Sequence, residues 1–157
     1  MSNSIHPETA HQMAECAAKW WADKLRGKVN HDNGDYSITS AFAMVLADMV
    51  AIKHPASEEQ IDRFQVILTG LIQNKIQEEP TRPLINFGCD YGPGWLLHDA
   101  AKEASIDPSL FPYKTWMYIM PEKGEVDVCD GYRAAPKNIF SCHANGGVIH
   151  ADQADSV

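Results

Sequence analysis

Two short stretches of alternating residues decide the fold: KTWMYIM at residues 114–120 and EVDVC at residues 125–129. Alternate residues of an extended chain point to opposite faces. In the first stretch this places Thr115, Met117 and Ile119 on one face and Lys114, Trp116 and Tyr118 on the other. Residues 121–124, PEKG, contain the glycine and proline that are typical of a turn. The two stretches are therefore predicted to form an antiparallel hairpin.

A strand and a helix are predicted before this hairpin. The segment EEPTRP at residues 78–83 contains two prolines, which remove backbone donors and stop a preceding helix. Leu84–Asp90 follows as a strand, with Ile85, Phe87 and Cys89 on one face. Pro93 then begins a helix, because proline suits the first helical turn.

Three further helices are predicted at the N-terminal side. Apolar residues recur at helical spacing from Pro7 to about Arg26 and from Ser37 to about Lys53, and a polar connection, Gly27–Tyr36, lies between these segments. The segment SEEQ at residues 57–60 is a capping box that opens the third helix.

These elements predict an α+β fold for a single domain, residues 1–157. Three N-terminal helices precede a β-α-β-β unit, and the helices cover one face of a small three-stranded sheet. If the first two strands are parallel neighbours, the helix between them crosses right-handedly. Residues 134–157 are predicted to form a weakly structured C-terminal tail with one anchored segment around Ile139–Phe140.

Composition excludes several classes of function. The 157 residues include 21 acidic and 13 basic side chains, a net charge of −8, which argues against direct nucleic-acid binding over a broad basic face. No apolar run approaches the roughly 20 residues that cross a membrane, and Met1–Ser4 does not begin a signal peptide, so a cytoplasmic location is expected. The four cysteines are widely spaced without a CxxC pair, so no metal site and no cofactor are expected.

The strongest candidate for a site is GCDYGPG at residues 88–94, where the predicted strand turns into a helix. Glycines let a backbone approach a ligand closely, and exposed N–H groups at a helix start bind anions. A structural explanation is also available, because Asp90 is placed to cap the helix and Pro93 has removed one donor. The segment matches neither the Walker pattern nor GxGxxG, so neither common nucleotide-binding motif is supported.

The hairpin region supplies an aromatic group with two cations among its members: Phe111, Tyr113, Trp116, Tyr118 and Tyr132, with Lys114 and Arg133. Such residues stack on a base or nucleotide ring while cations meet a phosphate. Equally, they fill the core of a small sheet, as most aromatic residues do. An exposed Trp116–Tyr118 face would favour a binding role.

A thiol enzyme is the alternative hypothesis. Cys89 and His98 suggest a nucleophile and its base, since an imidazole lowers the pKa of a neighbouring thiol. Strand parity argues against this pair, because Cys89 shares the core face of Ile85 and Phe87.

Several motifs together resemble small uncharacterised proteins of phages, integron cassettes and other mobile elements. They are Trp20-Trp21 with Leu25, Asn33-Gly34-Asp35, Asp90-Tyr91-Gly92-Pro93, Phe111-Pro112 with Lys114-Thr115 and Met117, and Gly131-Tyr132. The resemblance covers about residues 10–133 and implies an accessory or anti-defence role, in which a small acidic protein binds a host protein or a signalling nucleotide. It supplies no catalytic residues.

The resulting hypothesis is a non-enzymatic binding protein, encoded by a mobile element, that acts on a protein partner or a small nucleotide-like ligand. Its expected ligand-binding residues are Asp90, Tyr91, Gly92, Lys114, Trp116 and Tyr132. The alternative is a small hydrolytic or nucleotide-directed enzyme that uses Asp90, His98 or Cys89. A third hypothesis is a structural subunit that self-associates.

Overall fold

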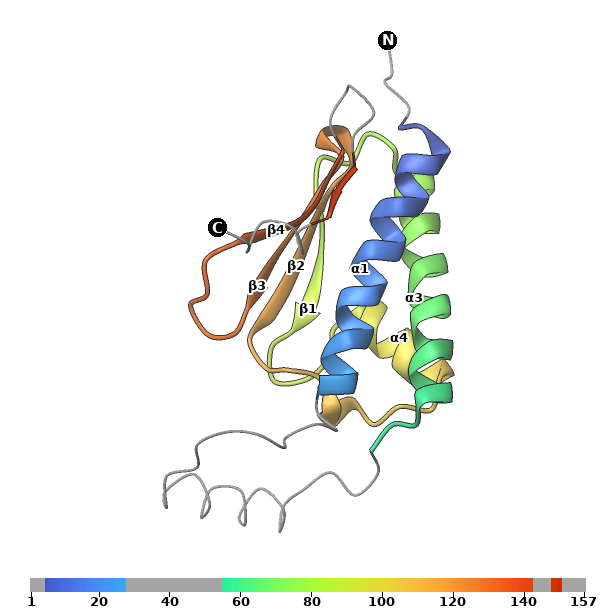
Figure 1. The fold of residues 1–157 in the computed structure, drawn as a ribbon, viewed down its shortest axis with the longest axis vertical. Coiled ribbons are helices and arrows are strands. Elements are labelled where there is room, and N and C mark those ends of the chain that lie inside the picture. The colour runs from blue at the N-terminus through green and yellow to red at the C-terminus, as the bar shows by residue number, and fades with distance from the viewer. Residues whose placement is uncertain (1–4, 28–54, 143–147, 151–157) are drawn as a thin grey trace.

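The computed structural model describes residues 5–27, 55–142 and 148–150. Here three helices cover one face of an antiparallel sheet, which confirms the predicted α+β class (Figure 1). The helices are α1 (Pro7–Gly27), α3 (Glu58–Glu78) and α4 (Trp95–Glu103). The strands, in their order across the sheet, are β1 (Ile85–Cys89), β2 (Thr115–Met120), β3 (Glu125–Asp130), β4 (Lys137–Cys142) and β5 (Val148–His150). The helix predicted over Ser37–Lys53 and its preceding connection lie outside the described residues.

The helices α1 and α3 form as their sequences predict and lie side by side. The N–H of Gln60 donates to Oγ of Ser57 at 3.1 Å, and the N–H of Ser57 donates to Oε1 of Gln60 at 2.9 Å. This capping box satisfies two backbone donors that the first turn of α3 leaves without helical partners. The buried faces of both helices then supply much of the core.

The sheet corrects the predicted three strands. The first two strands, β1 and β2, pair antiparallel, so the expectation for a parallel crossover does not apply. Within the predicted tail, β4 pairs with β3, and β5 pairs with β4. The β3–β4 register shifts at Val126/Asp127, and consecutive residues Ile139 and Phe140 are both buried. This irregularity removes the alternation by which a strand is recognised in sequence. Residues 143–147 and 151–157 of the predicted tail lie outside the described residues.

The core lies between the helices and the inner face of the sheet. Ring centroids of Trp21 lie 6.3 Å from Phe87 and 6.2 Å from Phe111, and Phe111 lies 5.6 Å from Phe64. Phe111, one of the grouped hairpin aromatics, therefore belongs to the core. On β2, Met117 and its inward neighbours are buried, whereas Trp116 and the outward residues are half-buried. No helix within the described ranges combines the length and apolar character needed to span a membrane.

Candidate functional site

Three loops adjoin the same end of the sheet. Cys89, Thr115 and Asp130 form one rung across β1, β2 and β3. The chain leaves β1 and β3 and enters β2 beyond this rung, so the adjoining loops are neighbours although they are far apart in sequence. We call this region the loop end and define it as residues 90–92, 113–114 and 130–137.

The first two loops are joined through Lys114 and Asp90. The ammonium group of Lys114 forms an ion pair with the carboxylate of Asp90, and the N–H of Lys114 donates to the carbonyl oxygen of Asp90 at 2.9 Å. The Lys114 Nζ also lies 4.0 Å from the centre of the Tyr91 ring. The side-chain hydrogen bond to Asp90 is the largest cause that raises the pKa of Lys114 above its ordinary value. Lys114 is therefore fully charged at neutral pH and bound on two sides.

Exposed tyrosines come from all three loops. The rings of Tyr91 and Tyr113 meet edge to face with centroids 6.1 Å apart, and these residues are 72% and 56% exposed. Tyr132, in the third loop, is 69% exposed and lies 5.1 Å below the guanidinium of Arg133. Each ring is oriented by a neighbouring ring or cation while most of its surface remains accessible.

The backbone at two of the cations is unusual. Among the described non-glycine residues, φ is positive only at Ser105, Lys114 and Arg133, with values of 58°, 55° and 57°. Ser105 directly follows the C-cap of α4, where a left-handed residue commonly ends a helix. Lys114 and Arg133 instead lie in the loop end. A left-handed conformation costs an L-residue about 1–2 kcal/mol, and such strain clusters at functional sites.

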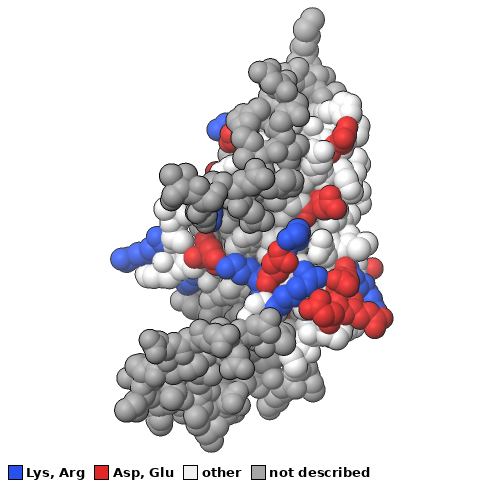
Figure 2. All heavy atoms as spheres, viewed as in Figure 1, with Lys and Arg blue, Asp and Glu red and all other residues white. Residues whose placement is uncertain are grey.

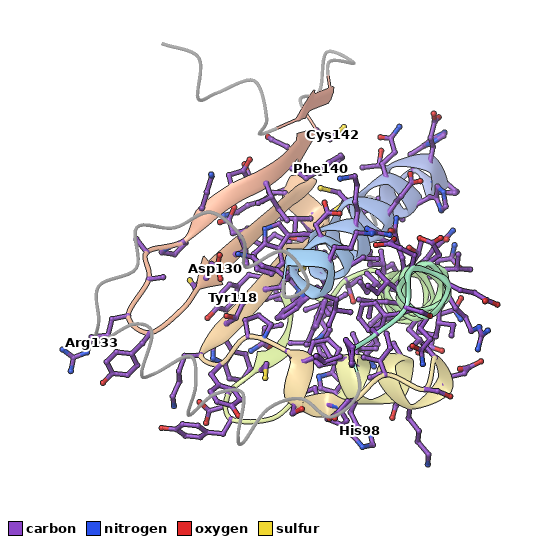
Figure 3. All side chains as sticks on the ribbon, turned by 60° about the horizontal axis from the view of Figure 1, so that its bottom comes forward. His98, Tyr118, Asp130, Arg133, Phe140 and Cys142 are labelled. Atoms are coloured by element: carbon purple, nitrogen blue, oxygen red, sulfur yellow. The ribbon has the colours of Figure 1, made fainter. Side chains whose placement is uncertain are left out.

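The loop end also contains an ion pair with α1. The ammonium group of Lys24, in the last helical turns, contacts the carboxylate of Asp130 and lies 5.0 Å from the Trp20 ring. Figure 3 shows Asp130 at the end of its strand and Arg133 projecting away from the strands and helices. The described residues contain no group of three or more His, Cys, Asp or Glu side chains that is arranged to bind a metal ion.

The predicted ligand-binding residues separate into groups. Lys114 contacts both Asp90 and Tyr91, and Tyr132 lies in the neighbouring turn at the same end of the sheet. Exposed Gly92 follows Tyr91 in the first loop, and a Cβ placed there would meet no atom within 4 Å. Trp116 is placed differently, on the outer face of the sheet opposite Gly88 and Cys129.

The structure corrects the explanation of Asp90 as a helix cap. The N-cap of α4 is Gly94, no side chain caps it, and the helix begins at Trp95 rather than at Pro93. The N–H of Gly94 donates instead to the carbonyl of Gly88 at 2.8 Å. Packing explains the glycine at position 88, because a Cβ there would lie 2.2 Å from the carbonyl oxygen of Thr115.

Four residues of the loop end were not among the predicted ligand-binding residues. Tyr113 and Arg133 were noted only as an aromatic residue and a cation of the hairpin region, and Asp130 and Lys137 were given no role. Tyr113 could have been identified from the sequence, because it directly precedes Lys114. Asp130 belongs to the loop end because the strand register brings the end of β3 beside the start of β2. No local signal reveals that register.

The two groups of the enzymatic alternative have different surroundings. The Cys89 side chain is completely buried on the core face of β1, as its parity predicts. The His98 side chain is 56% exposed, and its Nδ1 lies 3.4 Å from Oδ1 of Asp99. Figure 3 shows His98 on the outer side of α4, pointing away from the strands.

Comparison with known proteins adds no functional information: no protein-family model matches the chain, and a search of curated proteins finds no significant match.

Proposed function

We propose that this chain is a non-enzymatic binding protein of a mobile element, and that it binds a protein partner through the loop end. The observation that supports this proposal most strongly is the group of exposed tyrosines, Tyr91, Tyr113 and Tyr132, contributed by three loops at one end of the sheet. Tyrosine supplies a large amphipathic contact area with few rotatable bonds, so little conformational entropy is lost on binding.

The positions of the cations also support the loop end as the binding surface. Lys114 and Arg133 retain side chains at left-handed positions that glycine would occupy without strain. Asp90 and Tyr91 keep Lys114 in place from the adjacent loop. A surface built from strained but mutually supported residues is preorganised, which lowers the entropic cost of association.

The enzymatic alternative has less support from the geometry. A thiol nucleophile must reach both its substrate and a base, whereas Cys89 is buried and the imidazole of His98 lies on the solvent side of α4. Asp90 is engaged by Lys114. The arrangement of these residues favours binding over catalysis.

Affinity capture with matched variants tests the proposal. The wild-type protein, the triple variant Y91S/Y113S/Y132S and the control V66S serve as baits in lysate from cells that naturally contain the protein. Val66 is a suitable control because it is 73% exposed on α3, away from the loop end. We expect partners captured by the wild type and by V66S to be lost with the triple variant, while circular dichroism shows all three folded. Equal capture by the three baits would reject the loop end as the binding surface.

A further inference from the structure

We infer that the partner presents an acidic protein segment to the loop end, where Arg133 and Lys137 bind its carboxylates. This inference rests on the proposed function, and it specifies the chemistry of the partner. The whole chain and the loop end differ in the sign of their charge. The chain as a whole has a net charge of −8, whereas the loop end contains three cations, Lys114, Arg133 and Lys137, and two anions, Asp90 and Asp130.

Both anions of the loop end are already neutralised. Asp90 forms its ion pair with Lys114, and Asp130 forms one with Lys24 from α1. In the described part of the chain, Arg133 and Lys137 have no carboxylate within 4.0 Å. The loop end with Lys24 therefore has two cations in excess, Arg133 in the β3–β4 connection and Lys137 at the start of β4.

This excess differs from the charge elsewhere on the surface. Figure 2 shows Lys and Arg side chains interspersed with Asp and Glu in a band across one face. In that manner Arg26 binds Asp23, Glu58 and Asp62. Exposed Lys102 and Lys123 also lack a described ion pair, but each directly adjoins a glutamate in sequence, Glu103 and Glu122 respectively. Every other described cation thus has an acidic ion-pair partner or an acidic neighbour in sequence, whereas Arg133 and Lys137 have neither.

The geometry of Arg133 suits a carboxylate. Its guanidinium lies over the ring of exposed Tyr132 and projects from the body of the protein. A guanidinium binds a carboxylate through two parallel hydrogen bonds, and stacking on a ring limits its rotation beforehand. Lys137, four residues later at the start of β4, supplies a second positive charge nearby.

An acidic peptide fits this surface better than a nucleic acid. A strand of nucleic acid brings a phosphate with every nucleotide, and binding depends on neutralising several of them. The excess here is two cations on a protein of net charge −8, which repels a long polyanion. Screening at physiological salt acts over about 8 Å, so a short acidic segment experiences mainly the local positive charge.

Fluorescence anisotropy with labelled probes tests the inference on the full chain. The probes are a short glutamate-rich peptide, a glutamine-rich peptide of equal length and a single-stranded oligo-dT. We expect the acidic peptide to bind in preference to the neutral one, and more weakly as salt is raised. R133E/K137E should weaken binding at least about tenfold, since two charge-assisted contacts are reversed. K102E/K123E changes the net charge equally and should leave binding unchanged.

Two results would overturn the inference: equal losses in both double variants, or stronger binding of oligo-dT than of the acidic peptide through the same two cations. Partner capture with the same variants separates this inference from the proposed function. If capture survives R133E/K137E but is lost with Y91S/Y113S/Y132S, the loop end binds a partner without using the acidic chemistry. If capture survives both variants, the loop end is not the binding surface, and both proposals fail.

Discussion

The two ends of the sheet use left-handed backbone in different ways. At the turn end, β2 passes through the short 3₁₀ turn η2 (Pro121–Lys123) into Gly124, whose φ is 64°. Here the left-handed residue is glycine, which adopts this conformation without strain. At the loop end φ is positive at Gly131 too, but also at two residues that carry side chains, Lys114 and Arg133. At the turn end Gly124 suits its left-handed conformation. At the loop end Lys114 and Arg133 keep their side chains although their backbone is strained. Backbone strain of this kind clusters at functional sites, and it supports placing the proposed binding surface at the loop end.

The largest effect is expected at the base of the loop end. Ala at position 88 would place its Cβ 2.2 Å from the carbonyl oxygen of Thr115, and no side-chain rotation relieves a clash with backbone. We expect G88A to lower the free energy of unfolding by about 3 kcal/mol, the upper part of the range for overpacking. Urea denaturation measures this change. G92A is the matched control, because the added methyl meets no atom within 4 Å. Equal stability of G88A and the wild type would contradict the close strand approach.

A smaller effect is expected at the turn end. G124A forces a φ of 64° on an L-residue and brings its Cβ to 3.1 Å from Cβ of Cys142. We expect a loss of about 1–2 kcal/mol, which is the cost of the left-handed conformation. Thermal or urea unfolding reports it. A neutral G124A would remove the distinction between the two ends, since it would mean that glycine is not required at the tight turn.

Substitution by glycine at the loop end is expected to have the opposite sign. R133G releases the strain of a φ of 57° and should stabilise the fold by about 0.5 kcal/mol, because relief of about 1–2 kcal/mol exceeds the unfolded-state entropy of glycine. R133A removes the same side chain but keeps the strain, and it should be less stable than R133G. Urea unfolding of the pair isolates the backbone contribution. An R133A protein as stable as R133G would show that the position is unstrained. If Arg133 takes part in binding, R133G should lose partner capture while it gains stability.

The smallest effects concern pH, and they also distinguish the two ends. At the loop end the hydrogen bond to Asp90 raises the pKa of Lys114, so the folded chain binds this proton more tightly than the unfolded chain. The resulting stability is present below about pH 10.4, the usual lysine pKa, and is lost as pH rises through the folded value. The melting temperature of the wild type should therefore exceed that of K114M at neutral pH, and the difference should disappear in strong alkali. If the difference in melting temperature does not depend on pH, it arises from packing of the Lys114 side chain and not from its charge.

At the turn end the corresponding group is Glu79, in the segment that leads into β1. Hydrogen bonds from Lys75, and then from Arg82, lower its pKa. Its stabilising contribution is present above about pH 4.3, the usual glutamate pKa, and is lost as pH falls through the folded value. The small advantage of the wild type over E79Q should vanish in acid, as measured by melting temperature. Persistence of that advantage in acid would show that Glu79 stabilises the fold by another interaction.

Prediction succeeded where the controlling contacts are local. The capping box of Ser57 and Gln60 involves residues three positions apart, and the hairpin follows from alternation around a short turn. It failed at β4, where the irregular register with β3 buries Ile139 and Phe140 in succession. It also failed for Asp90, which binds Lys114 across two loops instead of capping the adjacent helix.

The amino-acid sequence by itself determined helices α1 and α3, the β2–β3 hairpin and the inward face of β2, because periodicity and capping act over a few residues. Only the tertiary structure decided the strand order, the pairing of Asp90 with Lys114 and of Asp130 with Lys24, and the exposure of the tyrosines. These features depend on contacts between residues distant in the chain. The left-handed conformations of Lys114 and Arg133 belong to the same group, since intrinsic preference opposes them and the surrounding structure must impose them.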